Sequence, residues 1–440
     1  MYLRKLAVEN IRSISNLSIE FEKGSEAGWH VILGPNGAGK SSLVRAFALL
    51  MMGEKEVYAA RQEFGVWISS DEIKATIEGS IVMDGEFDDL NGGGQPPKRA
   101  ITLQVSMERE DTSSLSAVSL KFSGTGFQRT IWGNGKGWFS ASFGPYRRFS
   151  GGDNKYDRLF VTNKRLAPHL TALGEDVALT DAMIWLSSLL NKFAVEEKRQ
   201  PGSGSDRLLI LIMQFLNTTG FLPHKASISQ IDSESVLVED GNKKLIALDQ
   251  LSDGYRSALS LVIELIRQMY ELYGEDKLTK ALSRNPGVID LPGVVMIDEI
   301  DVHLHPTWQR DIGKWLTRCF PAVQFIVTTH SPIICRAVIS DEGIQRGSIW
   351  KLPAQGTTDQ FRKVDDLELE QLAYGNVLDA YATELFGHEI TRSEHGQQKL
   401  ERLAELNIKS IEEDLVPEEE NERDDLRAIF PASAGILPQN

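Results

Sequence analysis

The phosphate-binding pattern at residues 34–41 constrains the fold of this chain more than any other feature. These residues read Gly-Pro-Asn-Gly-Ala-Gly-Lys-Ser and match the pattern in every position. An apolar stretch over 29–33 predicts a strand before the loop, and apolar spacing over 42–50 predicts a helix after it. Glycines let backbone N–H groups converge on a phosphate, and the helix N-terminus adds its positive dipole. The context therefore predicts an α/β P-loop fold.

The residue types in this loop suggest separate roles. We expect Lys40 to reach the β- and γ-phosphates of ATP and to act in catalysis, and the Ser41 hydroxyl to ligate Mg²⁺. The remaining phosphate contacts are expected from Gly34, Asn36, Gly37, Gly39 and Ser42.

A second motif, Val-Val-Met-Ile-Asp-Glu at 294–299, has the form of a Walker B strand. Its four apolar residues predict a buried parallel strand, which presents Asp298 at its carboxyl end. We expect Asp298 to hold Mg²⁺ and Glu299 to polarise the attacking water as general base. A further apolar strand over 324–327 leads to His330, which can hydrogen-bond a γ-phosphate.

Residues 251–257 (Leu-Ser-Asp-Gly-Tyr-Arg-Ser) open a predicted helix. In isolation this is an ordinary helix start, with Ser252 as the capping residue. Placed 42 residues before Val294, it resembles the signature motif of ABC-type ATPases. Ser252, Asp253 and Gly254 are then expected to contact nucleotide.

Composition and charge limit the class of protein. The chain has 47 basic and 62 acidic residues, a formal net charge of −15, and residues 411–427 alone carry −7. A generally basic, DNA-coating surface is excluded, but a local basic groove is left open, because Lys155, Arg158, Lys164 and Arg165 cluster in sequence. No apolar run approaches the ~18 residues of a membrane helix, and the N-terminus lacks a signal-peptide core. With only Cys319 and Cys335, both expected to be buried thiols, a cytoplasmic protein with no membrane partner is expected.

The chain between and after these motifs shows changing periodicity. Alternation over 75–83, 100–107 and 117–122 predicts antiparallel strands, and residues 236–247 predict a hairpin around Asp240-Gly241-Asn242. The sequence contains no heptad run, so we expect no long coiled coil. The predicted organisation is therefore an ATPase domain at 1–370, with a β-rich insertion at about 53–140 and a helical insertion at about 170–222, followed by an acidic helical extension at 371–440.

The motifs together resemble the prokaryotic SMC-like branch of the ABC ATPases. Within it they are similar to the group of OLD-family proteins and PtuA-type ATPases of Septu and retron anti-phage systems. The resemblance covers about residues 1–340 and rests on the following segments: Asn10-Ile11-Arg12-Ser13, the phosphate loop, the signature at 251–255, residues 143–148 (Phe-Gly-Pro-Tyr-Arg-Arg), residues 298–306 and residues 328–332.

The resemblance implies a head-to-tail homodimer or larger oligomer, with each ATP between Lys40 of one chain and Ser252 of the other. It also implies that Arg12 lies near the phosphates and that Asp301 belongs to a D-loop facing the partner subunit. The Q-loop glutamine is left open among Gln62, Gln104 and Gln128, or residues 144–148 take its place.

The function implied is that of an ATP-driven switch subunit in an anti-phage defence complex, which controls a separate effector such as an HNH or Toprim nuclease, or retron components. The alternative is a RecF/SMC-like ATPase that acts directly on DNA. A transporter module does not fit, because 212 residues separate Lys40 from Ser252. OLD proteins carry a Toprim domain after the ATPase; no Asp-x-Asp pair is found after Pro332, so we expect no nuclease activity from this chain.

Three other features have plainer interpretations. His303 and His305 are expected to cap a helix beside Pro306 rather than to bind metal. Trp308 and Trp315, seven residues apart, are expected in the core. The acidic run over 411–427 is a solvated helix face or, alternatively, a surface that docks a partner or excludes DNA.

Overall fold

The computed structural model describes residues 1–94, 97, 99–112, 118–133, 136–145, 163–173, 180–199, 207–222, 226–231, 236–357, 359–375, 394–412 and 415–430. The chain divides into two compact units, residues 1–374 and 375–440. None of the described helices combines the length and apolar character needed to cross a membrane.

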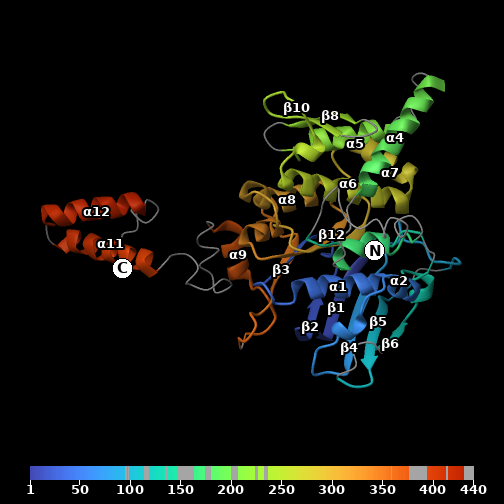
Figure 1. The fold of residues 1–440 in the computed structure, drawn as a ribbon, viewed down its shortest axis with the longest axis horizontal. Helices are drawn as coiled ribbons and strands as arrows, with labels where there is room; N and C mark the ends of the chain where they lie inside the picture. Colours follow the sequence, from blue (N-terminus) through green and yellow to red (C-terminus); the bar gives the residue numbers. More distant parts are fainter. Residues whose placement is uncertain are drawn as a thin grey trace. The chain divides into compact units, whose positions relative to one another are not determined.

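A six-stranded sheet holds the phosphate-loop strand at its centre (Figure 1). Neighbouring strands of this sheet pair in parallel, except that the edge strand β14 pairs antiparallel with β13. The two strands that lead to Asp298 and to His330 are buried along their whole length, as their apolar sequences predict. In spatial order the strands are β14 (Arg362–Lys363), β13 (Gly347–Lys351), β3 (Gly28–Leu33), β12 (Val323–Thr329), β11 (Gly293–Ile297) and β7 (Ser140–Phe143).

A second, five-stranded antiparallel sheet contains the strands predicted from alternation. Along β4 and β5, buried residues alternate with more exposed ones, so one face of this sheet packs on the core. In spatial order its strands are β2 (Ile14–Glu20), β1 (Tyr2–Ile11), β4 (Lys74–Val82), β5 (Ile101–Arg109) and β6 (Val118–Gly124).

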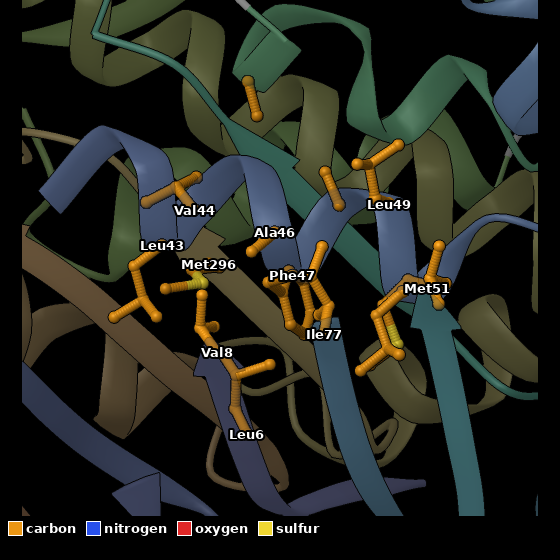
Figure 2. Close-up of a cluster of buried hydrophobic side chains, with 14 of the residues drawn as sticks. Leu6, Val8, Leu43, Val44, Ala46, Phe47, Leu49, Met51, Ile77 and Met296 are labelled. Atoms are coloured by element: carbon orange, nitrogen blue, oxygen red, sulfur yellow. The ribbon is translucent and has the colours of Figure 1, made fainter. Parts of the chain in front are cut away.

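Helix α1 (Lys40–Met51) packs between these two sheets (Figure 2). Leu43 and Phe47 pack in one cluster with Val8 and Ile77 of the antiparallel sheet and Met296 of the parallel sheet. A helix that is apolar on nearly every side must be buried on nearly every side. The core therefore fixes the helix that begins at the phosphate loop.

Helices and a small sheet complete the first unit. The hairpin predicted around Asp240 forms, and the Asp240 carboxylate accepts from the Asn242 and Lys244 amides at 2.8 Å each. Its left-handed residue is Lys243 (φ 60°) rather than Gly241. The elements are α2 (Glu54–Ala59), η1 (Phe64–Val66), η2 (Phe127–Arg129), η4 (Ala167–Leu173), α4 (Thr180–Arg199), α5 (Arg207–Thr218), β8 (Ser227–Ile231), β9 (Val236–Glu239), β10 (Leu245–Ala247), η7 (Leu248–Gln250), α6 (Asp253–Tyr273), α7 (Glu275–Arg284), α8 (Pro306–Cys319), η8 (Pro332–Val338) and α9 (Asp366–Tyr374).

The second unit contains a pair of helices, α11 (Glu394–Glu412) and α12 (Pro417–Ile429). Proline occupies the first helical position of α12, where its missing N–H costs nothing. Leu403, Leu406 and Leu426 are buried between the helices, and a Lys409–Glu419 ion pair joins them at 2.8 Å. Most described acidic residues of the run are exposed on α12: Glu418, Glu420, Glu422, Asp424 and Asp425.

Candidate nucleotide-binding site

The phosphate loop connects β3 to α1 and depends on its glycines. Gly37 and Gly39 adopt left-handed backbone conformations (φ 82° and 96°). A Cβ on Gly39 would lie 2.8 Å from Ile14 Cγ1, and one on Gly34 would lie 2.9 Å from Leu352 Cβ. No larger residue fits this path without strain. The loop therefore brings backbone N–H groups to the start of α1, as an anion site requires.

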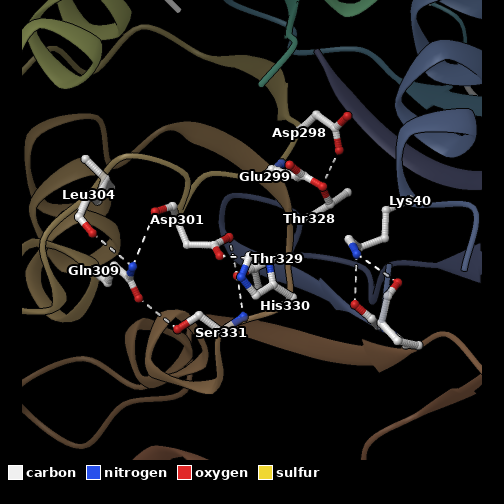
Figure 3. Close-up of polar contacts among 12 residues, drawn as sticks. Lys40, Asp298, Glu299, Asp301, Leu304, Gln309, Thr328, Thr329, His330 and Ser331 are labelled. Carbon is white, nitrogen blue, oxygen red and sulfur yellow. Dashed lines mark hydrogen bonds and ion pairs between the residues drawn. The ribbon is translucent and has the colours of Figure 1, made fainter. Parts of the chain in front are cut away.

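Lys40 lies over this loop with its ammonium group held inside the protein (Figure 3). Its Nζ donates to the carbonyls of Gly34 and Pro35 at 2.8 and 2.9 Å. Burial lowers the pKa of Lys40, and the negative charges of Glu299 and Asp298 oppose that shift. The cation and the two carboxylates therefore lie within electrostatic reach of one another.

The other loop residues differ in exposure. Asn36 is exposed, Ser41 is half-buried in the first turn of α1, and Ser42 is buried. Ser41 is therefore the hydroxyl of the pair that solvent and a ligand can reach.

Asp298 and Glu299 follow β11, and one hydroxyl contacts both of them. Thr328 Oγ1, on the adjacent strand β12, donates to Asp298 Oδ1 at 2.6 Å and accepts from the Glu299 amide at 2.9 Å. Glu299 adopts a left-handed backbone (φ 45°), which costs a residue with a Cβ about 1–3 kcal/mol. The Thr328 hydroxyl therefore helps to hold a strained residue beside the buried Asp298 carboxylate.

Asp301 and His330 form a second pair at the same edge of the sheet (Figure 3). His330 Nδ1 lies 3.1 Å from Asp301 Oδ2, and Thr329 Oγ1 donates to Asp301 Oδ1 at 2.5 Å. The Asp301 side chain is only 1% exposed, whereas that of His330 is 53% exposed. The oxygens of the Asp301 carboxylate are therefore used by residues of its own chain, and the assignment of Asp301 to a D-loop that faces a partner subunit stays a prediction.

Gln309, near the start of α8, forms hydrogen bonds with both the segment after β11 and the segment after β12. Its Nε2 donates to the carbonyls of Leu304 and Asp301 at 3.0 and 3.3 Å, and its Oε1 accepts from Ser331 Oγ at 2.8 Å. Neither this glutamine nor Thr328 was singled out from the sequence. The available signal was the presence of polar residues, Thr328 and Thr329, at the end of an otherwise apolar strand.

The signature motif lies at the N-terminus of α6 and packs on the segment after Walker B. Ser252 is the N-cap residue, but its exposed side chain makes no capping hydrogen bond. A Cβ on Gly254 would lie 2.6 Å from the His303 carbonyl oxygen, which explains glycine here. Asp253 forms an ion pair with Arg256. The Ser252 hydroxyl is therefore exposed at a helix N-terminus.

Trp308 and the two histidines differ from prediction in part. Trp308 is half-buried rather than in the core, and its ring lies 5.2 Å from that of Tyr255, next to the signature; Trp315 is buried as predicted. His305 does cap α8, through Thr307, but His303 is a left-handed turn residue (φ 66°) and not a cap.

Arg12 lies in the turn between β1 and β2, and this turn touches the phosphate loop. Ser13 Oγ would be 3.3 Å from a Cβ on Gly39. The Arg12 guanidinium lies 5.5 Å from the Trp67 ring centre. Burial, and then the nearby charge of Arg45, lower the pKa of Arg12. The structure therefore brings this turn to the loop and holds two cations close together beside it.

Strand β7 also ends beside Asp298, because the Asp298 amide donates to the Phe143 carbonyl at 2.8 Å. Gly144 follows that strand, and Tyr146, Arg147 and Arg148 lie outside the described residues, so the place of the Q-loop stays a prediction. The glutamines Gln104 and Gln128 lie in β5 and η2, and Gln62 follows α2.

Of the four residues that left a local basic groove open, Lys155 and Arg158 lie outside the described residues. Lys164 pairs with Glu271 at 3.2 Å, and Arg165 donates to the Gly133 carbonyl. Both cysteines are buried, as predicted. Within the described ranges no three His, Cys, Asp or Glu residues are grouped as metal ligands would be.

Comparison with known proteins identifies related chains. Residues 5–200 match the family model "AAA domain", and residues 159–336 match "AAA domain, putative AbiEii toxin, Type IV TA system". The Septu protein PtuA of Bacillus mycoides (strain KBAB4) is 26% identical over 362 residues, covering 78% of this chain. The Retron Ec83 probable ATPase of Escherichia coli is 36% identical over 132 residues, covering 30% of this chain.

The aligned parts span 40% and 22% of the lengths of these two relatives. Among solved structures, an SMC head bound to the C-winged helix domain of ScpA aligns with a TM-score of 0.46 and 13% identity, covering 83% of this chain and 98% of that one. The sequence matches confirm the predicted similarity to the Septu PtuA protein and the retron ATPases, to which this chain is homologous, and the fold is the α/β fold that the phosphate loop predicts.

Proposed function

We propose that this chain binds ATP with Mg²⁺ and hydrolyses it. One observation carries the proposal: the buried ammonium group of Lys40 lies within electrostatic reach of Asp298 and Glu299. Thr328 contacts both acidic residues, and all of these groups lie where three neighbouring parallel strands end. Nucleotide chemistry in α/β sheets takes place at this edge.

The residues present fit such a ligand. The glycine loop and the start of α1 would hold the phosphates, with Lys40 against the β- and γ-phosphates, and Ser41 and Asp298 would hold Mg²⁺. The metal would supply neutralisation of charge on the phosphate oxygens. Glu299 would take a proton from the attacking water, and His330, oriented through Nδ1 by Asp301, would present Nε2 to the γ-phosphate.

The test is phosphate release measured with Mg²⁺ and with EDTA in its place. We expect turnover only with the metal. Release that is equal in the two conditions would contradict the assignment of Asp298 and Ser41.

We further propose that two chains close head to tail around ATP, each offering its Ser252 to the nucleotide of the other. The exposed hydroxyl at the start of α6 supports this. Ser252→Arg should stop hydrolysis with little loss of ATP binding. Mixed with Lys40→Ala chains, it should recover about one working site per mixed dimer, and no recovery at any ratio would contradict sites built from two chains.

The homology to PtuA and to the retron ATPase supports a role as the ATPase subunit of an anti-phage defence complex in the cytoplasm, where ATP-driven dimerisation controls a separate effector, a nuclease. Direct action on DNA is the other outcome to be tested. A gel shift at stated salt, with and without ATP, separates them, because a DNA-acting ATPase would bind duplex with a steep salt dependence. An ATP-dependent shift by the chain alone would favour the second role.

A further inference from the structure

A cavity of about 650 Å³ lies away from the nucleotide site, at the opposite ends of the elements that carry its motifs. Met51, the last residue of α1, lines it, whereas Lys40 begins that helix; at 1.5 Å per residue the two are about 17 Å apart. Gln268 of α6 lines it as well, about 23 Å along that helix from Asp253. The cavity is therefore separate from the phosphate loop but shares its helices.

The walls combine aromatic and cationic side chains. Trp138, Phe139 and Trp185 supply flat apolar surface and Arg165 supplies positive charge, while Lys164 is paired with Glu271 of the same wall at 3.2 Å. A volume of this size is in the range of sites that bury a small organic ligand, about 300–1,000 Å³.

Three residues of the wall have buried polar atoms without a hydrogen-bond partner among the described residues: Arg165 Nη1, Trp185 Nε1 and Gln268 Oε1. Trp185 is 7% exposed and Gln268 5%. The other amide atom of Gln268 is engaged, since Nε2 donates to Glu264 Oε1 at 2.7 Å. A buried polar group without a partner is unfavourable and rare in native proteins, so three such groups in one wall require an explanation, and a bound ligand supplies one. Two donors of the wall, Arg165 Nη1 and Trp185 Nε1, thus lack an acceptor, and one acceptor, Gln268 Oε1, lacks a donor.

We propose that this cavity is a second ligand site, for a small aromatic anion of the mononucleotide type. A planar base would lie among the aromatic rings, as stacking favours. Its phosphate would accept from Arg165 and the Trp185 indole. Lys164 adds no net charge, because it pairs with Glu271 of the same wall. A donor on the base edge would satisfy Gln268 Oε1. Because α6 also begins at the signature, an occupied cavity would act on the helix that carries Ser252.

The test is calorimetric titration of the Lys40→Ala chain, whose phosphate loop is disabled, with AMP, GMP, CMP and UMP, and with inorganic phosphate. At least one mononucleotide should bind at one site per chain, and inorganic phosphate should bind at least about tenfold more weakly because it lacks the ring. No mononucleotide binding below millimolar concentration, or binding seen only with an intact Lys40, would overturn the proposal.

Variants locate the site. Arg165→Leu and Trp185→Phe should each weaken binding at least about tenfold, the second with hardly any change in shape. Lys192→Met, on an exposed part of the same helix as Trp185, is the matched control and should change the Kd less than twofold. Circular dichroism verifies folding of each variant. If the parent and Trp185→Phe chains bound the mononucleotide with equal affinity, the proposal would also be overturned.

Discussion

The Thr328 hydroxyl offers the sharpest test of how the acidic pair is held. Thr328 is fully buried, and valine matches its shape without the hydroxyl. Thr328→Val therefore removes the donor to Asp298 Oδ1 and the acceptor for the Glu299 amide while keeping the packing. Thr328→Ser is the matched control, because it keeps the hydroxyl and removes one methyl group.

The two changes should differ in magnitude. A hydrogen bond to a carboxylate contributes about 1.5–3 kcal/mol, and a buried amide that loses its acceptor costs about 1–3 kcal/mol. Allowing for relaxation, Thr328→Val should lower the free energy of unfolding by about 2–4 kcal/mol. Thr328→Ser loses one buried methyl group, worth about 1 kcal/mol.

Urea unfolding and ATP turnover measure the two consequences. We expect a lower midpoint for the valine variant and, because Glu299 then loses part of what holds its left-handed conformation, at least about tenfold slower turnover. The serine variant should keep most of its activity. Equal stability of the two variants, or normal turnover in Thr328→Val, would refute the proposed role of this hydroxyl.

Three further predictions concern the same chain. Lys40→Ala should weaken ATP binding at least about 100-fold in an equilibrium binding assay, because the phosphates lose their buried cation; wild-type affinity would contradict the loop assignment. Glu299→Gln should slow hydrolysis about 10²–10⁴-fold while ATP still binds, leaving a persistent closed dimer visible by size-exclusion chromatography, and turnover at the parent rate would remove Glu299 from catalysis. Burial lowers the pKa of His30 to about 4 and that of His169 to about 3, so the unfolded chain, titrating near 6.5, binds more protons between these values. Stability should be full above about pH 6.5 and about 3 kcal/mol lower at pH 5.5, with His169→Gln removing about half of the difference between urea midpoints at pH 7.5 and 5.5.

The strands that alternate and the two apolar parallel strands were predictable because their patterns are long enough to show a period. β7 and β13 were not predicted. Each has only four or five residues, and each joins the parallel sheet through contacts far away in sequence, Phe143 beside Asp298 and Gly347 beside Trp29. Sequence periodicity carries no information on such pairing, so the order of strands in the sheet followed only from the structure.

The candidate site likewise has parts that could be predicted from local sequence and parts that could not. Gly39, Lys40 and Asp298 could be identified from residue type and spacing, because backbone conformation and charge are encoded locally. The hydrogen bonds between side chains could not be predicted. Thr328 and Gln309 have no motif of their own, and the inward direction of Asp301 depends on how the segment after β11 crosses the end of β12.

That crossing explains why two neighbouring threonines contact different acidic residues: Thr328 contacts Asp298 and Glu299, and Thr329 contacts Asp301. Successive side chains of a strand point to opposite faces, so Thr328 and Thr329 could not contact one straight neighbouring strand in the same way. The segment 298–301 instead turns over the end of β12: the Ile300 amide donates to the Thr328 carbonyl at 3.1 Å, Thr328 meets the Asp298–Glu299 side, and Thr329 meets Asp301. The left-handed backbone at Glu299 belongs to this turn. A displacement of β12 against β11 would therefore move Glu299 and His330 together, which would couple the proposed general base to the proposed phosphate contact within one chain.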